Sequence, residues 1–334
     1  MNKVTMADVA QKAGVSKSTV SQFINNRFQY MADSTQERIR DVINELGYIP
    51  NFTAKSLKQK KSATIGVIVA NILHNFSTEI IRSIEDECGF NNFHLFVCNA
   101  DDDPDKERDY IDMLVAKQVD GLIIFPTNGN VDLYQRLKLA NFPIIFVDRK
   151  IDEPLYPTIL LDNKKAAELA VESILQKNRK DIALVATSII RNVTPRVERI
   201  NGFKEALLDN GIEPNLDWII AVDRENIKSQ LEKVWSSNIR PKAFFATNDL
   251  SLIELLKFIR ENNIQIPQDV SVIAIDDSPF LEISNPPVTV IKQPTFEMGK
   301  EAVRKLLLLM TEESLENTYD IKRYAPTLIE RKSL

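Results

Sequence analysis

Three short patterns of apolar and polar residues open the chain. Apolar positions within residues 9–13 and again within 20–24 have the spacing of two short amphipathic helices. Gly14 lies between them and can adopt the positive φ that ends a helix, while the hydroxyl of Ser16 can cap the second helix. A third set of apolar positions within residues 39–46 predicts another helix, which would close a three-helix core.

Beyond residue 62, short apolar runs alternate with longer amphipathic stretches. The first runs are TIGVIVA, HLFVCNA, GLIIFP, PIIFVD and TILLD, and a second set follows as DIALVAT, WIIAV, AFFAT and VSVIAID. Such alternation predicts parallel sheets covered by helices on both faces, and two sets predict two lobes. The predicted fold class is therefore α/β, with a small all-α unit followed by a two-lobed body.

Length and charge indicate several domains, of which the first carries an excess of basic residues. A chain of 334 residues exceeds what one core supports, so two or three domains are expected. Residues 1–61 hold ten Lys and Arg against five Asp and Glu, whereas residues 62–334 hold 32 against 42. A basic head on an acidic body predicts a polyanionic partner that contacts the head. Without a signal-peptide pattern or an apolar run near the roughly 20 residues of a membrane helix, a cytoplasmic protein with no membrane partner is expected.

The residues give little support to a metal site or to catalysis. Cys88 and Cys98 show no CxxC pattern, so two reduced, buried thiols are favoured over a disulfide or a metal site. His74 and His94 fall in separate predicted elements. The acidic run at 101–107 precedes a helix, whose N-terminus favours such charges, and is interpreted as a solvated helix start. No GxGxxG, GxxxxGK[ST] or nucleophile with a paired base occurs, so neither a cofactor nor an enzymatic activity is expected.

The two opening helices have the arrangement of a helix-turn-helix, whose second helix enters the DNA major groove. Its outward side offers Lys17, Ser18 and Gln22 to phosphates or base edges. Spacing alone leaves open an ordinary three-helix cap with a solvated polar face. However, VTMADVAQKAGVSKSTVSQFIN, continued by ELGYIPNFTAKSLK, closely resembles the headpiece of the lac/gal repressor family of bacterial transcription regulators, and the resemblance extends along the whole chain. It implies DNA binding.

The resemblance implies a headpiece at 1–49 and, at 50–61, a hinge that folds as a helix in the DNA minor groove. Alone, about ten such residues cannot hold a helix, so a disordered basic linker is the alternative. Gln22 stands where the family usually has arginine, and because glutamine favours adenine this predicts a changed base preference. The implied DNA-binding residues are Thr5, Ser16, Lys17, Ser18, Thr19, Gln22, Asn25, Asn51, Ala54, Lys55, Leu57 and Lys58, with Leu57 as the wedge between base pairs.

The body resembles periplasmic sugar-binding proteins, which implies an effector-binding and dimerisation domain at 62–334. Its lobes would span about 62–161 with 293–325, and 162–292. Ligands of open α/β sheets lie outside the carboxyl ends of the strands, where this chain has the pairs DR, ND and DD. From the residues alone each pair could also be a helix cap or a surface loop. The resemblance implies that the effector contacts Phe76, Asp148, Arg196, Arg199, Arg224, Asn248 and Asp276.

The arginines near the second lobe bear on the effector's charge. Arg191, Arg196, Arg199 and Arg224 fall in segments that the family uses there, and Arg224 takes the place of a frequent aromatic ring. Solvated surface arginines are the alternative. A guanidinium matches a carboxylate or phosphate, which predicts a sugar acid such as a keto-deoxy sugar acid, with a neutral sugar or sugar phosphate as alternatives.

The expected protein is a homodimeric repressor of carbohydrate-use genes, because a palindromic double-stranded operator requires two-fold symmetry. A transport-type binding protein is the competing class, but it would explain only the body.

Overall fold

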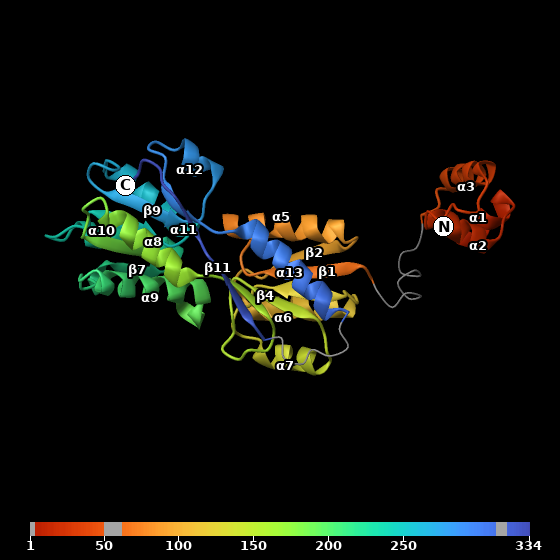
Figure 1. The fold of residues 1–334 in the computed structure, drawn as a ribbon, viewed down its shortest axis with the longest axis horizontal. Coiled ribbons are helices and arrows are strands. Elements are labelled where there is room, and N and C mark those ends of the chain that lie inside the picture. Colours follow the sequence, from red (N-terminus) through yellow and green to blue (C-terminus); the bar gives the residue numbers. More distant parts are fainter. Residues whose placement is uncertain (1–3, 50–61, 312–318) are drawn as a thin grey trace. The chain divides into compact units, whose positions relative to one another are not determined.

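The structure is a computed structural model that describes residues 4–49, 62–311 and 319–334 (Figure 1). The chain forms two compact units, residues 1–62 and 63–334. The predicted hinge at 50–61 lies outside the described residues. We call the first unit the headpiece and the second the body.

The headpiece is the predicted three-helix unit. α1 is Met6–Ala13, α2 is Lys17–Ile24 and α3 is Asp33–Leu46. Gly14 ends α1 at φ 62°, and the Ser16 side chain caps α2 by accepting a hydrogen bond from the Thr19 amide at 3.1 Å. The buried hydrophobic core consists of Val9, Ala10, Ala13, Val20, Ile39, Val42 and Tyr48.

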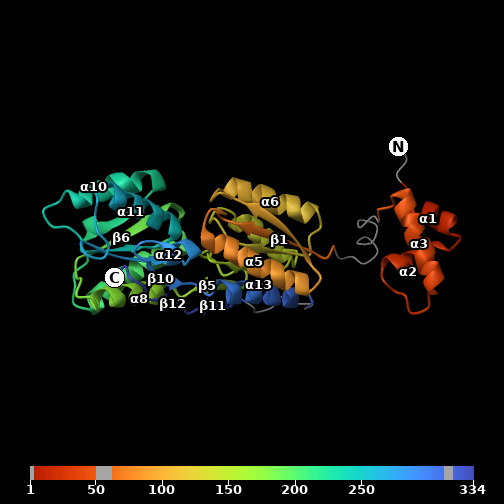
Figure 2. The ribbon, with the colours of Figure 1, turned by 90° about the horizontal axis from the view of Figure 1, so that it is seen from above.

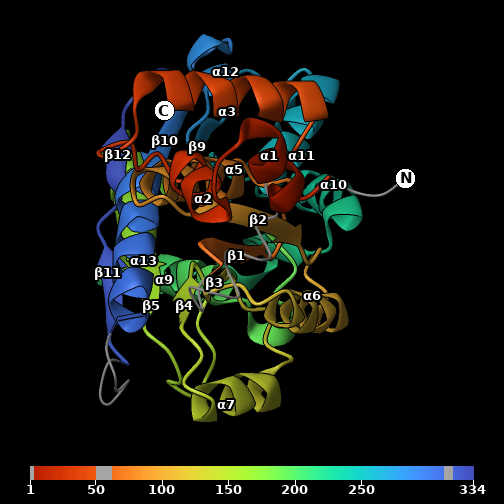
Figure 3. The same ribbon diagram turned by 90° about the vertical axis from the view of Figure 1, so that its right-hand side faces the viewer.

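Lobe one of the body is built on a parallel sheet with the strand order β11-β5-β4-β3-β1-β2. Its strands are β1 (Thr64–Val69), β2 (His94–Asn99), β3 (Gly121–Ile124), β4 (Ile144–Val147), β5 (Thr158–Leu161) and β11 (Ile321–Tyr324). One face packs on α5 (Asn75–Phe90) and α13 (Thr295–Leu309), and the other on α6 (Pro104–Ala116) and α7 (Val131–Leu139). Figure 3 shows α13 and α6 on opposite sides of this sheet.

Lobe two repeats this design with the strand order β12-β10-β9-β8-β6-β7. The strands are β6 (Ile182–Thr187), β7 (Ile219–Val222), β8 (Ala243–Ala246), β9 (Ser271–Ile275), β10 (Thr289–Lys292) and β12 (Thr327–Ile329), of which β12 alone pairs antiparallel, with β10. α8 (Asn163–Leu175) and α9 (Thr194–Asp209) cover one face, and α10 (Ile227–Trp235) and α11 (Asp249–Glu261) the other. Short helices η1 (Ile190–Asn192), η2 (Leu216–Trp218), η3 (Arg224–Asn226) and α12 (Pro279–Ile283) lie in its connections.

The chain passes between the lobes several times, after β5, after β10 and after β11, and Figure 2 shows the lobes as separate layered blocks. All nine apolar runs form the strands β1 to β9, as predicted. The last strand, β12, brings residues beyond 325 back to lobe two, a return that the sequence pattern does not predict. Cys88 and Cys98 are free, buried thiols, as expected. Among the described residues, none of the helices is long and apolar enough to cross a membrane.

Candidate functional site

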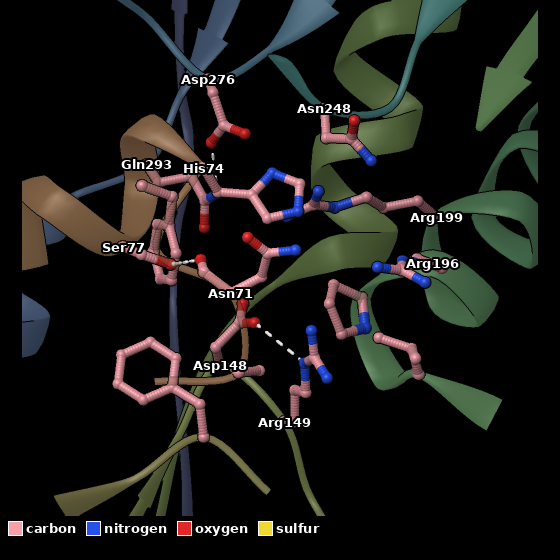
Figure 4. Close-up of a pocket in the computed structure, with 15 residues that line it drawn as sticks. Asn71, His74, Ser77, Asp148, Arg149, Arg196, Arg199, Asn248, Asp276 and Gln293 are labelled. Carbon is pink, nitrogen blue, oxygen red and sulfur yellow. Dashed lines mark hydrogen bonds and ion pairs between the residues drawn. The ribbon is translucent and has the colours of Figure 1, made fainter. Parts of the chain in front are cut away.

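A cavity lies where the two lobes of the body meet (Figure 4). The carboxyl ends of β1, β3 and β4 reach it from lobe one, and those of β8 and β9 reach it from lobe two, together with the start of α9. Parallel strands place these ends at one edge of each sheet, which explains why residues far apart in sequence converge here. The lining residues are Ala70, Asn71, His74, Phe76, Ser77, Phe125, Asp148, Arg149, Val193, Pro195, Arg196, Arg199, Asn248, Asp276 and Gln293.

Six of the seven residues expected to contact an effector line this cavity: Phe76, Asp148, Arg196, Arg199, Asn248 and Asp276. Arg224, the seventh, is not among the residues that line this cavity. It follows the edge strand β7, and both its Nε and its Nη2 lie 2.9 Å from Glu254 Oε1 on α11. Its side chain, 40% exposed, is therefore an ion-pair partner on the outside of lobe two. The side chain of Arg191 lies outside what the structure describes.

Arg199 is the most firmly held of the lining arginines. It is buried on α9, where Nε donates to Asn163 Oδ1 at 2.8 Å and Nη1 donates to the Thr247 carbonyl at 2.6 Å. Arg196 lies one turn earlier on the same helix face and donates to the Ser188 carbonyl at 2.8 Å. Figure 4 shows both side chains reaching toward the cavity from this helix.

Arg149 is a lining residue that the sequence reasoning missed. It is buried, its Nη1 lies 2.7 Å from Asp102 Oδ1, and its Nε lies 3.7 Å from Asp148 Oδ2 without donating a hydrogen bond. Its signal in the sequence is the strand-end pair DR, of which the family resemblance implies only the aspartate as an effector contact. Asp148 has φ 66°, and the backbone turn at this left-handed residue lets two consecutive side chains line the same cavity.

The acidic run at 101–107 is only partly the solvated helix start that we expected. Asp103 does cap α6, accepting from the Asp105 amide at 2.9 Å. Glu107, by contrast, is fully buried and accepts hydrogen bonds from the Thr127 amide and the Tyr134 hydroxyl. Glu107 is buried because its side chain turns toward the loop that follows β3, whereas Asp103 and Asp105 near the same helix start are exposed.

Asp102 also departs from the expected solvated helix start. Its side chain points to the arginines of the cavity. Besides its contact with Arg149, its Oδ2 lies 3.5 Å from Arg196 Nη2. Burial acts to raise the pKa of Asp102, but the charges of Arg149 and Arg196 outweigh it and hold the pKa below the usual range. Burial and the like charge of Arg149 lower the pKa of Arg196. Asp102 is thus a counter-charge that Arg149 and Arg196 share.

Hydrogen-bond acceptors complete the lining. Burial raises the pKa of Asp148, and it raises the pKa of Asp276 to about 6 against the opposing charge of Arg199. Gln293 Nε2 donates to Asp276 Oδ1 at 2.5 Å, while Asn248 caps α11 through its side-chain oxygen. Carboxylate and amide oxygens beside guanidinium donors suit a ligand that carries both hydroxyl groups and a negative charge.

Polar contacts beside the cavity join the lobes. His74 Nδ1 lies 2.6 Å from Asp249 Oδ1, and the Asn75 amide donates to Asp249 Oδ2 at 2.7 Å. Burial acts to raise the pKa of Asp249, but the hydrogen bond with His74 and the charge of that ring lower it overall. Asn75 Nδ2 also donates to the Asp277 carbonyl at 2.8 Å. The start of α5 is therefore fastened to the start of α11, so the arrangement of the lobes depends on groups that adjoin the cavity.

The headpiece presents the predicted polar set on α2. Lys17, Ser18 and Gln22 are exposed, whereas Asn25 Nδ2 donates a hydrogen bond to the Ser21 carbonyl at 2.7 Å. Thr5 and Ser16 serve as helix caps, and the Thr19 hydroxyl lies 2.8 Å from the Ser16 hydroxyl. The remaining expected DNA contacts, Asn51, Ala54, Lys55, Leu57 and Lys58, lie outside the described residues.

Comparisons with known proteins agree on both units. Residues 5–51 match the family described as bacterial regulatory proteins, lacI family, and residues 171–334 match a periplasmic binding protein-like domain. The probable HTH-type transcriptional regulator EndR of Paenibacillus polymyxa is 41% identical, over 99% of this chain and 98% of the relative. The HTH-type transcriptional regulator KdgR of Bacillus subtilis is 33% identical, over 91% and 90%.

Solved structures extend the similarity to the whole fold. The lac repressor dimer bound to operator and the anti-inducer ONPF is 26% identical, with a TM-score of 0.83 over 99% of both chains. The complex of the transcriptional regulator CelR with cellobiose is 25% identical, with a TM-score of 0.72 over 99% of this chain and 100% of that one. These proteins are transcription regulators rather than enzymes.

Proposed function

The chain belongs to the LacI family of bacterial regulatory proteins and is a DNA-binding transcription regulator, and we propose that it is a homodimeric repressor whose operator binding is controlled by a sugar acid. A keto-deoxy sugar acid is the class that we favour. The regulated genes would serve carbohydrate use, and the protein would act in the cytoplasm.

The observation that carries the effector proposal is the charge of the cavity. Three arginines, of which Arg149 and Arg199 are buried and Arg196 is 14% exposed, line the same space as Asp148 and Asp276. A carboxylate is bound most strongly by guanidinium groups that are already shielded from water, because the ion pair is then weakly screened. Arg149 supplies the third guanidinium, so the charge argument does not depend on Arg224.

A neutral sugar is the second candidate, and two observations favour it. Asp148, Asn248 and Asp276 offer acceptors for several hydroxyl groups, which a neutral sugar would also satisfy. CelR, whose fold this chain shares, forms a complex with cellobiose, an uncharged disaccharide. A sugar phosphate is a third possibility, because guanidinium groups bind phosphate as readily as carboxylate.

For the DNA contact, we propose that α2 enters the major groove with Lys17, Ser18 and Gln22 toward the DNA, supported by the caps Thr5 and Ser16. The hinge with Leu57 would reach the minor groove. Two protomers would read the halves of a palindrome, since a two-fold operator matches a two-fold dimer.

Calorimetric titration of the purified full chain with matched sugars tests the effector class. Gluconate and its keto-deoxy derivative are expected to bind at least about tenfold more tightly than glucose, a difference of about 1.4 kcal/mol. A gel-shift assay on an operator selected from a random library then shows whether the bound acid changes DNA affinity. Tight binding of glucose with no response to either acid would rule out the charge argument and leave the regulator assignment intact.

A further inference from the structure

We propose that Asp102 is an internal competitor for anions, a carboxylate that the protein itself places on the cavity arginines and that the negative group of an effector displaces. The proposal deepens the proposed function and rests on it, because it concerns how the same cavity distinguishes a charged from a neutral ligand.

The geometry of the ion pairs carries the proposal. Asp102 Oδ1 lies 2.7 Å from Arg149 Nη1, and its Oδ2 lies 3.5 Å from Arg196 Nη2. Arg149 follows β4 of lobe one, whereas Arg196 lies on α9 of lobe two. One carboxylate group thus contacts guanidinium groups from both walls of the cavity, which is what the carboxylate of a bound sugar acid would do.

The backbone at Asp101 and Asp102 has an unusual conformation that the start of α6 does not require. Asp101 and Asp102 both have left-handed backbone conformations, with φ 52° and 58°, and the Asp102 amide donates to the Ala70 carbonyl at 2.6 Å. Consecutive left-handed residues are unfavourable for side chains with a Cβ. Asp103 alone already caps α6. The bend places Asp102 next to the cavity residue Ala70 and within reach of Arg149 and Arg196.

Competition by Asp102 would lower the affinity of the cavity for anions without lowering its affinity for neutral sugars. An incoming carboxylate or phosphate replaces one anion by another, so the arginines stay neutralised and the hydroxyl contacts to Asp148 and Asp276 add to the affinity. A neutral sugar leaves Asp102 in place and gains nothing from Arg149. Displacement of Asp102 also removes its contact with Arg196, so occupancy of the cavity changes a link between the lobes.

Thermal unfolding and titration of Asp102→Asn test this idea, with Asp101→Asn as the matched control. Asp101 is the adjacent carboxylate, but it pairs with Lys106 and Asn99 rather than with the arginines. Both variants and the unchanged protein are melted in inorganic phosphate and in sodium chloride of equal ionic strength, and are then titrated with gluconate and glucose. Asp102→Asn is expected to bind phosphate and gluconate about tenfold more tightly than the other two proteins, with glucose affinity unchanged.

The phosphate series separates this proposal from the effector proposal. Equal phosphate stabilisation in all three proteins, or an equal gain in Asp101→Asn, would overturn the role of Asp102 whatever the effector is. If wild type prefers glucose to gluconate, the sugar-acid proposal fails, but a phosphate gain specific to Asp102→Asn still supports the competitor. Should Asp102→Asn unfold in chloride, phosphate is expected to restore its folded melting transition. A variant that stays unfolded in phosphate contradicts the proposal.

Discussion

The headpiece and the body organise their candidate functional side chains in opposite ways. In the headpiece, Lys17, Ser18 and Gln22 stand on the exposed side of a single eight-residue helix. In the body, the cavity collects side chains from both lobes, from Ala70 after β1 to Gln293 after β10. A surface on one helix follows directly from local spacing, whereas a cavity between lobes exists only when the tertiary structure has formed.

The two regions also differ in how much core supports them. The headpiece core comprises seven buried hydrophobic residues, while a single cluster of lobe one, which includes Ile80, comprises 18. Small cores bury a smaller fraction of their surface and leave little reserve of stability. The headpiece is therefore expected to lose its fold first when either unit is weakened by the same amount.

The largest expected effect tests this difference in reserve. Ile39→Ala removes a fully buried side chain from the headpiece core and should cost about 2–5 kcal/mol of unfolding free energy. The expected result is loss of operator binding in a gel shift, with effector affinity unchanged in calorimetry. Ile80→Ala in lobe one is the matched control and should leave the headpiece's melting transition in place. Unaltered DNA binding by Ile39→Ala at 37 °C would contradict the comparison.

The next effect concerns the cavity. Arg199→Met removes the hydrogen bonds to Asn163 Oδ1 and to the Thr247 carbonyl, and it removes a positive charge from the cavity. Loss of a buried, hydrogen-bonded charge partner should weaken effector binding by about a hundredfold. Arg224→Met, the matched control on the outside of lobe two, should change it less than about twofold. Calorimetry of both variants decides, and equal losses would place Arg224 in the binding site after all.

The sequence pattern predicts most of the fold because hydrophobic periodicity reflects burial directly. The headpiece helices and the strands β1 to β9 all follow from it. The return of the chain through β12 does not, since a three-residue strand with one exposed and two partly buried residues carries too little apolar pattern.

The cavity is harder to predict, because contact between distant strand ends depends on how strands and loops are placed. Asp148 and Asp276 follow central strands and are found at the cavity, whereas Arg224 follows an edge strand and is not. Arg149 directly follows the left-handed residue Asp148, and Asp102 is itself in a left-handed backbone conformation. Such turns redirect a side chain without leaving a periodic signal.

A smaller effect is expected on the DNA side. Gln22 is exposed on α2, and Gln22→Ala should relax the preference at one base pair of each half-site, at about 1–3 kcal/mol. The measurement is selection from a randomised operator library. Asn25→Ala serves as the control because the Asn25 side-chain amide already donates a hydrogen bond to the Ser21 carbonyl. If both variants select the same sequences as wild type, α2 does not read bases through Gln22.

The smallest effect is a difference in pH dependence between aspartates of the two units. Burial raises the pKa of Asp276 from its ordinary value of 3.8 to about 6. Between those values the folded body keeps a proton that the unfolded chain has released, so stability is lost as the pH rises through 6. This loss should amount to about 1 kcal/mol between pH 5 and pH 7. In the headpiece, hydrogen bonds from the backbone and hydroxyl of Thr5 lower the pKa of Asp8, so its contribution is lost as the pH falls.

Urea unfolding of wild type and Asp276→Asn at a series of pH values isolates the body's part of this contrast. Asparagine is uncharged at every pH and tolerates the φ of 80° at this position. The stability of wild type relative to the variant should therefore fall as the pH rises from 5 to 7. For the headpiece transition, Asp8→Asn against wild type should give a difference of the opposite slope, with wild type gaining relative to the variant as the pH rises from 2 to 5. If the stability difference between wild type and variant changes with pH in the same direction at both sites, burial does not control the titration of Asp276. The contrast between the exposed Asp8 and the buried Asp276 would then fail.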